Sequence, residues 1–277
     1  IIDMSRIIEL DFTRGVAVFL MILSHLAVFM NIGLRNIEPD KSAEILKVSN
    51  QRVKFFHKMG VLAHTIFIIL VGVNMVTSYN NSKKKLEKEK IEDEQEFNNK
   101  LKKNYTVKNI KRAIFIGLLG LLMSIIIKVV FGKWYVVFGI FQFISVSILL
   151  SIPIQLFYDH ILAIVLILGL ILFKCVNFSK QSKLNLKSIF TGKINSNNKF
   201  LDFFPIIPYF IFVVIGIMIG NTNFKVKLSD KRKNNDTVKE LSFMGQWSLQ
   251  FYFLHLIIIF GILKIVLLKK NKGIIQI

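Results

Sequence analysis

The sequence predicts an all-α protein, a polytopic transmembrane helical bundle with about seven spans. Of its 277 residues 53% are hydrophobic, and the apolar residues come in blocks of about twenty. The charged residues fill the gaps between these blocks, whereas a soluble domain of this size would interleave the two kinds. Because about twenty apolar helical residues cross the roughly 30 Å of hydrocarbon in a bilayer, each block is long enough for one span.

The expected spans follow one another along the chain. The uncharged run from Gly15 to Leu34 is too long for the apolar core of a signal peptide and shows no cleavage site, so we expect a retained helix. A short break, FYDH at 157–160, separates the fourth span from the fifth. The predicted spans are 15–34, 60–79, 113–131, 135–157, 159–178, 203–221 and 243–268.

The connections between the spans favour a single domain over residues 1–277. None of them shows a repeat or is large enough to fold around a core of its own. The first, 35–58, is expected to be a polar connection. The second, a charged cytoplasmic loop at about 80–112, is predicted to be a surface helix or a disordered arm of mixed charge.

The net charge of +20 comes from 37 Lys and Arg against 17 Asp and Glu. In a soluble protein this excess would suggest nucleic acid, but here the cations lie beside apolar spans, where they contact anionic head groups and fix topology. No nucleic-acid-binding motif accompanies them, so we exclude nucleic acid as a partner. With a cytoplasmic N-terminus, inside segments hold 19 Lys and Arg and outside segments 16. This favours a multi-pass protein of the plasma membrane with its N-terminus in the cytoplasm.

Ionisable residues inside a span are costly, so they are functional candidates. Eleven residues separate Arg14 from His25, which brings the two side chains to within about 20° of one direction and about 16 Å apart along the helix. Arg14 is thus expected at one membrane surface and His25 near the midplane, on one face. Asp11 precedes Arg14 by three residues and can pair with it if the helix starts early.

The last span repeats this pattern. Ser248, Tyr252 and His255 fall at i, i+4 and i+7, on one face, and His255 is expected at about the depth of His25. Such a set suits hydrogen bonding or proton transfer in a central polar cavity. The structural alternative for each histidine is an interhelical hydrogen bond that holds the bundle together. His64, at the start of the second span, is expected to be interfacial rather than catalytic.

The opening stretch, RIIELDFTRGVAVFLMILSH, resembles the start of the membrane acyltransferases related to heparan-α-glucosaminide N-acetyltransferase. The pair Arg14 and His25 also looks like the Arg-x10-His pattern of the broader membrane acyltransferase-3 group. Matching segments follow in order over nearly the whole chain: HTIFIILVGVNMVTSY (64–79), KRAIFIGLLGLL (111–122), FGIFQFISVSILLSIP (138–153), FFPIIPYFIFVVIGIMIG (203–220) and MGQWSLQFYFLH (244–255).

This resemblance implies an integral membrane acyltransferase that takes an acetyl group from cytoplasmic acetyl-CoA and delivers it to a cell-surface saccharide or glycolipid. It implies a catalytic set of His25, His255 and Tyr252, with His25 as general base for the acceptor or as a transient acyl carrier. Donor and acceptor would be bound by Arg14, which suits CoA phosphates or a thioester carbonyl, together with Asp11, Ser248 and Gln142.

Two other functions stay open on the residues alone. A proton-coupled small-molecule transporter would use His25 and His255 as a proton relay, and a partner-binding membrane subunit would use its polar residues only as structural contacts. The single cysteine, Cys175, excludes an intrachain disulfide and a Cys-based metal site. We expect no bound metal, no tightly bound cofactor and acetyl-CoA as co-substrate, with membrane lipids as partners and homo-oligomerisation left open.

Overall fold

The computed structural model confirms the predicted all-α class over the residues it describes. Apart from one isolated parallel bridge between Phe138 and Phe203, the described elements are helices. The described residues are 8–37, 42–89, 91–131, 136, 138–175, 186–192, 203–222 and 235–271, and side chains are described for 8–27, 54–89, 91–129, 136, 138–173, 186–192, 203–222, 235–259, 261–262 and 265.

The chain divides into two compact units, which are described one at a time. The first comprises Ile1–Phe67 and Lys225–Ile277, and the second comprises Ile68–Phe224. The long helix α2 (Ser42–Glu87) passes from the first unit into the second. The two ends of the sequence therefore belong to one unit, and the middle forms the other.

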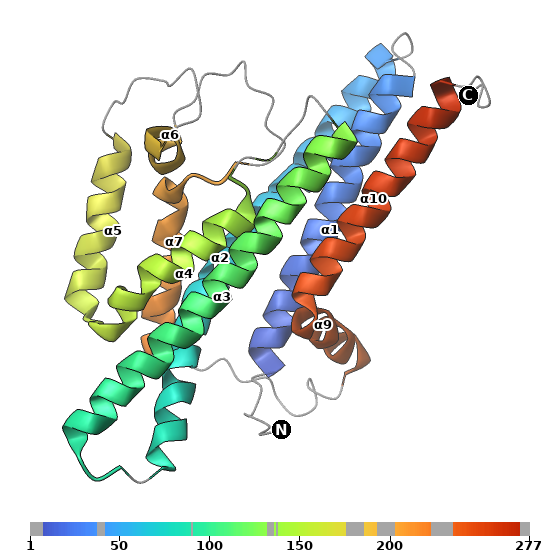
Figure 1. Cartoon of the computed structure of the whole chain (residues 1–277). Coiled ribbons are helices and arrows are strands. Elements are labelled where there is room, and N and C mark those ends of the chain that lie inside the picture. Colours follow the sequence, from blue (N-terminus) through green and yellow to red (C-terminus); the bar gives the residue numbers. More distant parts are fainter. Residues whose placement is uncertain are drawn as a thin grey trace. The chain divides into compact units, whose positions relative to one another are not determined.

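The first unit is built on α1 (Ile8–Ile37), which packs against two C-terminal helices, α9 (Asp236–Gln246) and α10 (Ser248–Asn271). Figure 1 shows α10 running alongside α1, with the short helix α9 at the end of both where they begin. The side chain of Asn235 caps α9 by accepting a hydrogen bond from the backbone N–H of Thr237 at 2.9 Å. The first unit thus joins the N-terminal helix to the last two helices.

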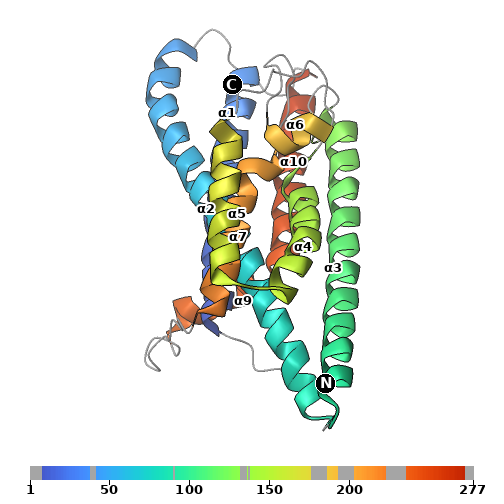
Figure 2. The same cartoon turned by 90° about the vertical axis from the view of Figure 1, so that its left-hand side faces the viewer.

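The second unit contains the rest of α2 and five further described helices. In Figure 2, α3 and α4 run side by side, and α5 stands next to α7. The short helix α6 also contacts α7, and α7 contacts α4. The bounds are α3 (Glu94–Phe131), α4 (Ile140–Leu156), α5 (His160–Cys175), α6 (Leu186–Thr191) and α7 (Ile206–Asn221).

Small residues let α2 and α7 approach each other closely in the second unit. A Cβ at Gly72 would overlap the carbonyl oxygen of Val213, and a Cβ at Gly216 would overlap that of Ile69. Such backbone contact is typical of helices packed in a membrane. The hydrophobic effect does not drive helices together there, and small residues let them approach closely enough for van der Waals packing. Pro205 directly precedes α7, at a helix start, where proline is tolerated.

The described part of the chain has three helices long and apolar enough to cross a membrane, at Ile8–Ala27, Lys54–Glu87 and Glu94–Val129. Four shorter apolar helices match the other predicted spans: Ile140–Leu156, His160–Phe173, Ile206–Asn221 and Ser248–Ile259. Large apolar side chains also stand exposed along α3 and α5, as lipid-facing residues do. The chain is a membrane protein with several apolar helices, and the number seven stays a prediction.

Two predicted connections are largely helical. The polar connection expected at 35–58 is replaced by the end of α1 and by α2, which begins at Ser42, while 38–41 lie outside the described residues. In the charged segment at 80–112, α2 continues to Glu87 and α3 starts at Glu94, so most of the segment is helical and belongs to the two long helices rather than to a separate surface helix. Hydropathy detects the part of a helix that lies in hydrocarbon, and polar turns beyond it do not end the helix.

Candidate functional site

A pair of histidines from two helices forms the centre of the candidate site in the first unit. Nδ1 of His25 on α1 lies 2.9 Å from Nε2 of His255 on α10. The rings are within 12° of coplanar and their centroids are 5.2 Å apart. Because the two nitrogens are much closer than the centroids, the rings meet edge to edge, which is the in-line geometry of a hydrogen bond. The two histidines lie at a similar depth, as predicted, and their contact is also the interhelical hydrogen bond that the structural alternative predicts.

A backbone carbonyl determines which ring nitrogens carry protons. Nδ1 of His255 lies 2.9 Å from the carbonyl oxygen of Phe251. A carbonyl oxygen can only accept, so Nδ1 of His255 is the donor. In the neutral pair, Nε2 of His255 is then an acceptor and Nδ1 of His25 donates to it. The other nitrogen of His25, Nε2, is left in the unprotonated form that a general base requires.

Tyr252 stands edge-on to both imidazoles. Its ring is 6.4 Å from that of His25 at an interplanar angle of 80°, and 5.4 Å from that of His255 at 89°. Near-perpendicular aromatic pairs at such separations are favourable, so Tyr252 helps to hold the plane that the two histidines share. Tyr252 and His255, which the sequence predicted to share one face of α10, therefore both contact His25.

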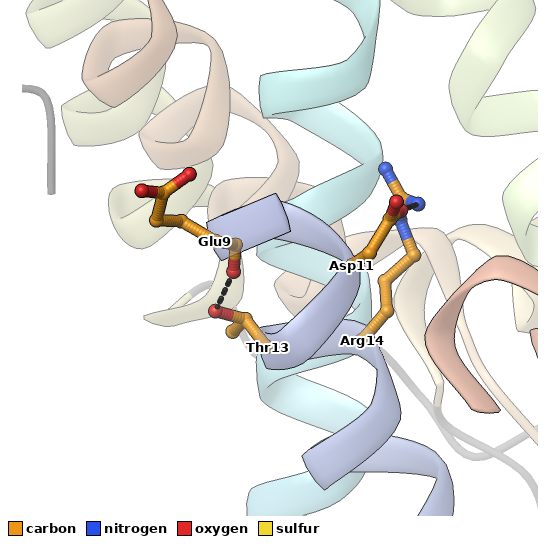
Figure 3. A network of polar contacts seen from close by, with 4 residues as sticks. All are labelled: Glu9, Asp11, Thr13 and Arg14. Carbon is orange, nitrogen blue, oxygen red and sulfur yellow. Dashed lines mark hydrogen bonds and ion pairs between the residues drawn. The ribbon is translucent and has the colours of Figure 1, made fainter. Parts of the chain in front are cut away.

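Arg14 and Asp11 form an ion pair near the start of α1. Nη1 of Arg14 lies 2.5 Å from Oδ1 of Asp11, whose side chain is buried. The helix begins at Ile8, early enough for the predicted pairing. Figure 3 shows these two side chains together on one side of α1, while Thr13 bonds back to Glu9 on the other. A buried carboxylate beside it holds the guanidinium in one place, where it can bind an anionic or carbonyl oxygen.

The start of α1 is in backbone contact with α9. A Cβ on Gly245 would overlap the carbonyl oxygen of Asp11, and a Cβ on Gly15 would overlap that of Leu241. Both glycines lie where the helices touch, so α9 fixes the turn of α1 that carries the Asp11–Arg14 pair. The sequence reasoning missed α9 because it began a single span at residue 243. Gly245 and the mixed polarity of 236–246 were the signals that could have indicated a separate helix.

Ser242 on α9 is a second residue that the sequence reasoning missed. It is 3% exposed, and its Oγ has no hydrogen-bond partner among the described residues, like Oδ2 of Asp11. Buried polar atoms are normally paired. Each of the helices α1 and α9 therefore carries a buried oxygen that could still accept a hydrogen bond.

Ser248 and Gln142 are the two remaining predicted binding residues, and each is described within its own unit. Ser248 is the first residue of α10, half-buried and one turn before Tyr252. Gln142 belongs to the second unit, where its Nε2 donates to Oγ of Ser124 at 2.9 Å and its Oε1 accepts from the backbone N–H of Gly139 at 3.1 Å. These bonds give Gln142 a structural role at the start of α4, and the binding roles of both residues stay predictions.

The chemistry available in this unit is proton transfer at the histidine pair, with a guanidinium held by Asp11 on the same helix, about 16 Å away along its axis. Two bonded imidazoles can accept, share and return a proton, and Arg14 supplies a fixed positive charge. Within the described residues no group of three or more His, Cys, Asp or Glu side chains could hold a metal ion.

The family model for the heparan-α-glucosaminide N-acetyltransferase catalytic domain matches residues 6–257. The chain belongs to this family. The match includes the His25, Tyr252 and His255 cluster and the Asp11–Arg14 ion pair of the first unit. No curated protein and no solved structure matches the chain.

Membership of this N-acetyltransferase family supports a membrane acetyltransferase-type function. It gives no support to the proton-coupled transporter that the residues alone left open. The relation to the broader acyltransferase-3 group stays a prediction.

Proposed function

We propose that the protein moves an acetyl group from cytoplasmic acetyl-CoA to an amine or hydroxyl of a cell-surface saccharide or glycolipid. The observation that carries this proposal is the His25–His255 hydrogen bond, together with the Phe251 carbonyl that sets its tautomers. The enzyme would lie in the plasma membrane with its N-terminus in the cytoplasm, so that Arg14 is at the cytoplasmic end of α1.

In the transfer step, Nε2 of His25 takes the proton of the acceptor amine or hydroxyl as that atom attacks the thioester carbonyl. The bond between acyl carbon and acceptor forms, the bond between acyl carbon and sulfur breaks, and CoA leaves as a thiolate. The proton gained at Nε2 of His25 allows the one at its Nδ1 to shift toward Nε2 of His255. The positive charge is thus spread over two rings and directed at the Phe251 carbonyl.

Arg14 would bind the phosphates or the thioester carbonyl of acetyl-CoA, and Asp11 would hold its guanidinium in place. A rise of about 16 Å separates Arg14 from His25 along α1, a distance that the extended pantetheine arm of CoA would span. Ser248 and Gln142 are proposed as further contacts to donor or acceptor, and Tyr252 as the residue that keeps the two imidazoles in position.

The test gives purified protein in lipid nanodiscs labelled acetyl-CoA and a panel of amino and hydroxyl sugars. We expect transfer by the wild type and a loss of about 10²- to 10⁴-fold in kcat with His25→Ala, the range that a general base contributes. His160→Asn is the matched control, because that histidine is exposed in the second unit. Absence of transfer by the wild type, or full activity of His25→Ala, would contradict the proposal.

The same assay separates a general base from an acyl carrier. If His25 only removes a proton, acetyl-CoA without acceptor releases no CoA. A transient acetyl-imidazole would instead release CoA in a burst equal to the enzyme concentration and leave label on the protein. The hydrogen bond from Nδ1 of His25 to His255 favours the base.

A further inference from the structure

A third histidine lies on α2 in the same unit as the His25–His255 pair. The proposed transfer ends with a proton on the histidine pair and a thiolate on CoA, so one group must carry the proton back. His64 is half-buried and belongs to the first unit, as do His25 and His255. The sequence pattern assigned it to the membrane interface, because one helix considered alone does not show what lies beside it.

The packing of α2 against α1 brings His64 close to His25. A Cβ on Gly60 of α2 would overlap the hydroxyl of Ser24 on α1, the residue before His25. Ala63, 1% exposed, adds a second small residue on this part of α2. His64 follows Gly60 by four residues, so it lies on the same face one turn further along.

The directions of the helices place His64 between His25 and Arg14. Figure 1 shows that this part of α2 runs antiparallel to α1. One turn forward from Gly60 therefore corresponds to one turn back from Ser24, toward Arg14. Helical side chains tilt toward the N-terminus of their own helix. In two antiparallel helices this tilt turns the His25 and His64 side chains toward each other.

A second observation agrees with this placement. His25 and His64 interact electrostatically, as do His64 and His57. His57 is exposed on α2, three residues before Gly60, and so lies on the far side of the Gly60–Ser24 contact from Arg14. Of the two α2 histidines, His64 is the one placed toward the acyl donor.

We propose that His64 returns the proton from the His25–His255 pair to the thiolate of CoA. This inference rests on the proposed acetyl transfer. The acceptor gives its proton to His25, His25 passes one proton to His64, and His64 gives it to the sulfur, which forms the thiol. One N–H or O–H bond of the acceptor is exchanged for one S–H bond, so no other co-reactant is needed. His64 acts after the acyl group has moved.

The experiment compares the first turnover with steady-state turnover in His64→Asn and His64→Gln. We expect the first turnover, measured by rapid quench with labelled acetyl-CoA, to stay within about threefold of the wild type. Steady-state kcat should fall about 10- to 100-fold, within the range for a positioned proton-transfer group. Added imidazole should restore much of the turnover of His64→Ala, because it supplies the missing base in solution.

His57→Asn is the matched control, an exposed histidine on the same helix that should leave both rates unchanged. Wild-type steady-state turnover in both His64→Asn and His64→Gln would overturn the inference. It would also be overturned if both rates fell equally without imidazole rescue, since that is the result of a structural role. Either result leaves the proposed function intact as long as His25→Ala is inactive and the wild type transfers acetyl groups.

Discussion

The two units differ in whether they bury a carboxylate or an imidazole. Among the described residues, the first unit buries an ion-paired carboxylate, Asp11, and an imidazole, His255, besides the hydroxyls of Ser24 and Ser242. The second buries amides and hydroxyls, of which Gln155 pairs with Asn221 and Ser151 donates to the carbonyl of Ser147. Neutral groups that hydrogen-bond to one another can join helices in a membrane at a low cost in free energy. Ionisable groups cost more there and are retained for chemistry.

This difference suggests a division between a reacting unit and a supporting unit. In the first unit the His25–His255 bond connects two ionisable rings that can exchange a proton. In the second, the amide pair between Gln155 and Asn221 has fixed donors and acceptors, so it can only hold α4 to α7. Substitutions in the two units should therefore affect different measurements.

The largest effect is expected from His255→Leu. The substitution removes the acceptor for Nδ1 of His25, so the base loses both its tautomer and the ring that shares its charge. We expect kcat for acetyl transfer to fall about 10²- to 10³-fold, while the KM for acetyl-CoA changes little. The second unit provides the comparison in Ser151→Ala, which removes a buried hydroxyl and should leave kcat within about threefold. Equal losses in both variants would contradict the division.

The next effect concerns packing, in which the two units should behave alike. Gly245→Ala places a methyl group against the carbonyl of Asp11, and Gly72→Ala does the same against Val213. Overpacking of this kind costs about 1–3 kcal/mol, measured as a lower free energy of unfolding in mixed micelles. Gly169→Ala is the control, because its Cβ would meet open space. If Gly245→Ala is as stable as Gly169→Ala, the α1–α9 contact is not needed.

The sequence predicted the elements of the site better than their assembly. A repeat of eleven residues was enough to place Arg14 and His25 on one face, because helix periodicity is a local property. For His255 the sequence predicted only a depth similar to that of His25, and the structure adds the contact between them. The helix α9 and the position of His64 depend on which helices touch, which no single-helix pattern contains. For the same reason Gln142, similar to a family motif, could not be placed in the second unit beforehand.

A smaller effect is expected at the amide pair of the second unit. Nδ2 of Asn221 donates to Oε1 of Gln155 at 2.9 Å, and Nε2 of Gln155 donates back at 3.3 Å. Hydrogen bonds between helices in membranes contribute about 0.6 kcal/mol on average and at most about 1.7. A double-mutant cycle with Gln155→Leu and Asn221→Leu should give a coupling in this range, with kcat unchanged. A coupling of zero would mean that α4 and α7 are joined by apolar packing alone.

The smallest effect is expected outside the membrane, at the turn between α2 and α3. The hydrogen bond from Lys100 to the exposed Glu89, 2.8 Å long, lowers the pKa of this carboxyl from its ordinary value of 4.5. A carboxyl whose folded pKa is lowered stabilises the fold above its unfolded pKa, and this contribution is lost as the pH falls through the folded value. Glu89 is exposed, so solvent screens the pair and the change should be confined to the turn.

The measurement is amide hydrogen exchange of residues 86–100, compared at pH values above and below the titration of this carboxyl and corrected for the intrinsic rate at each pH. We expect protection of the turn to decrease on acidification in the wild type and to be independent of pH in Glu89→Gln. Acetyl transfer should be the same in both proteins at neutral pH, because the charged turn belongs to the supporting unit. A loss of activity in Glu89→Gln would instead connect the turn to the reaction and remove the distinction between the two units.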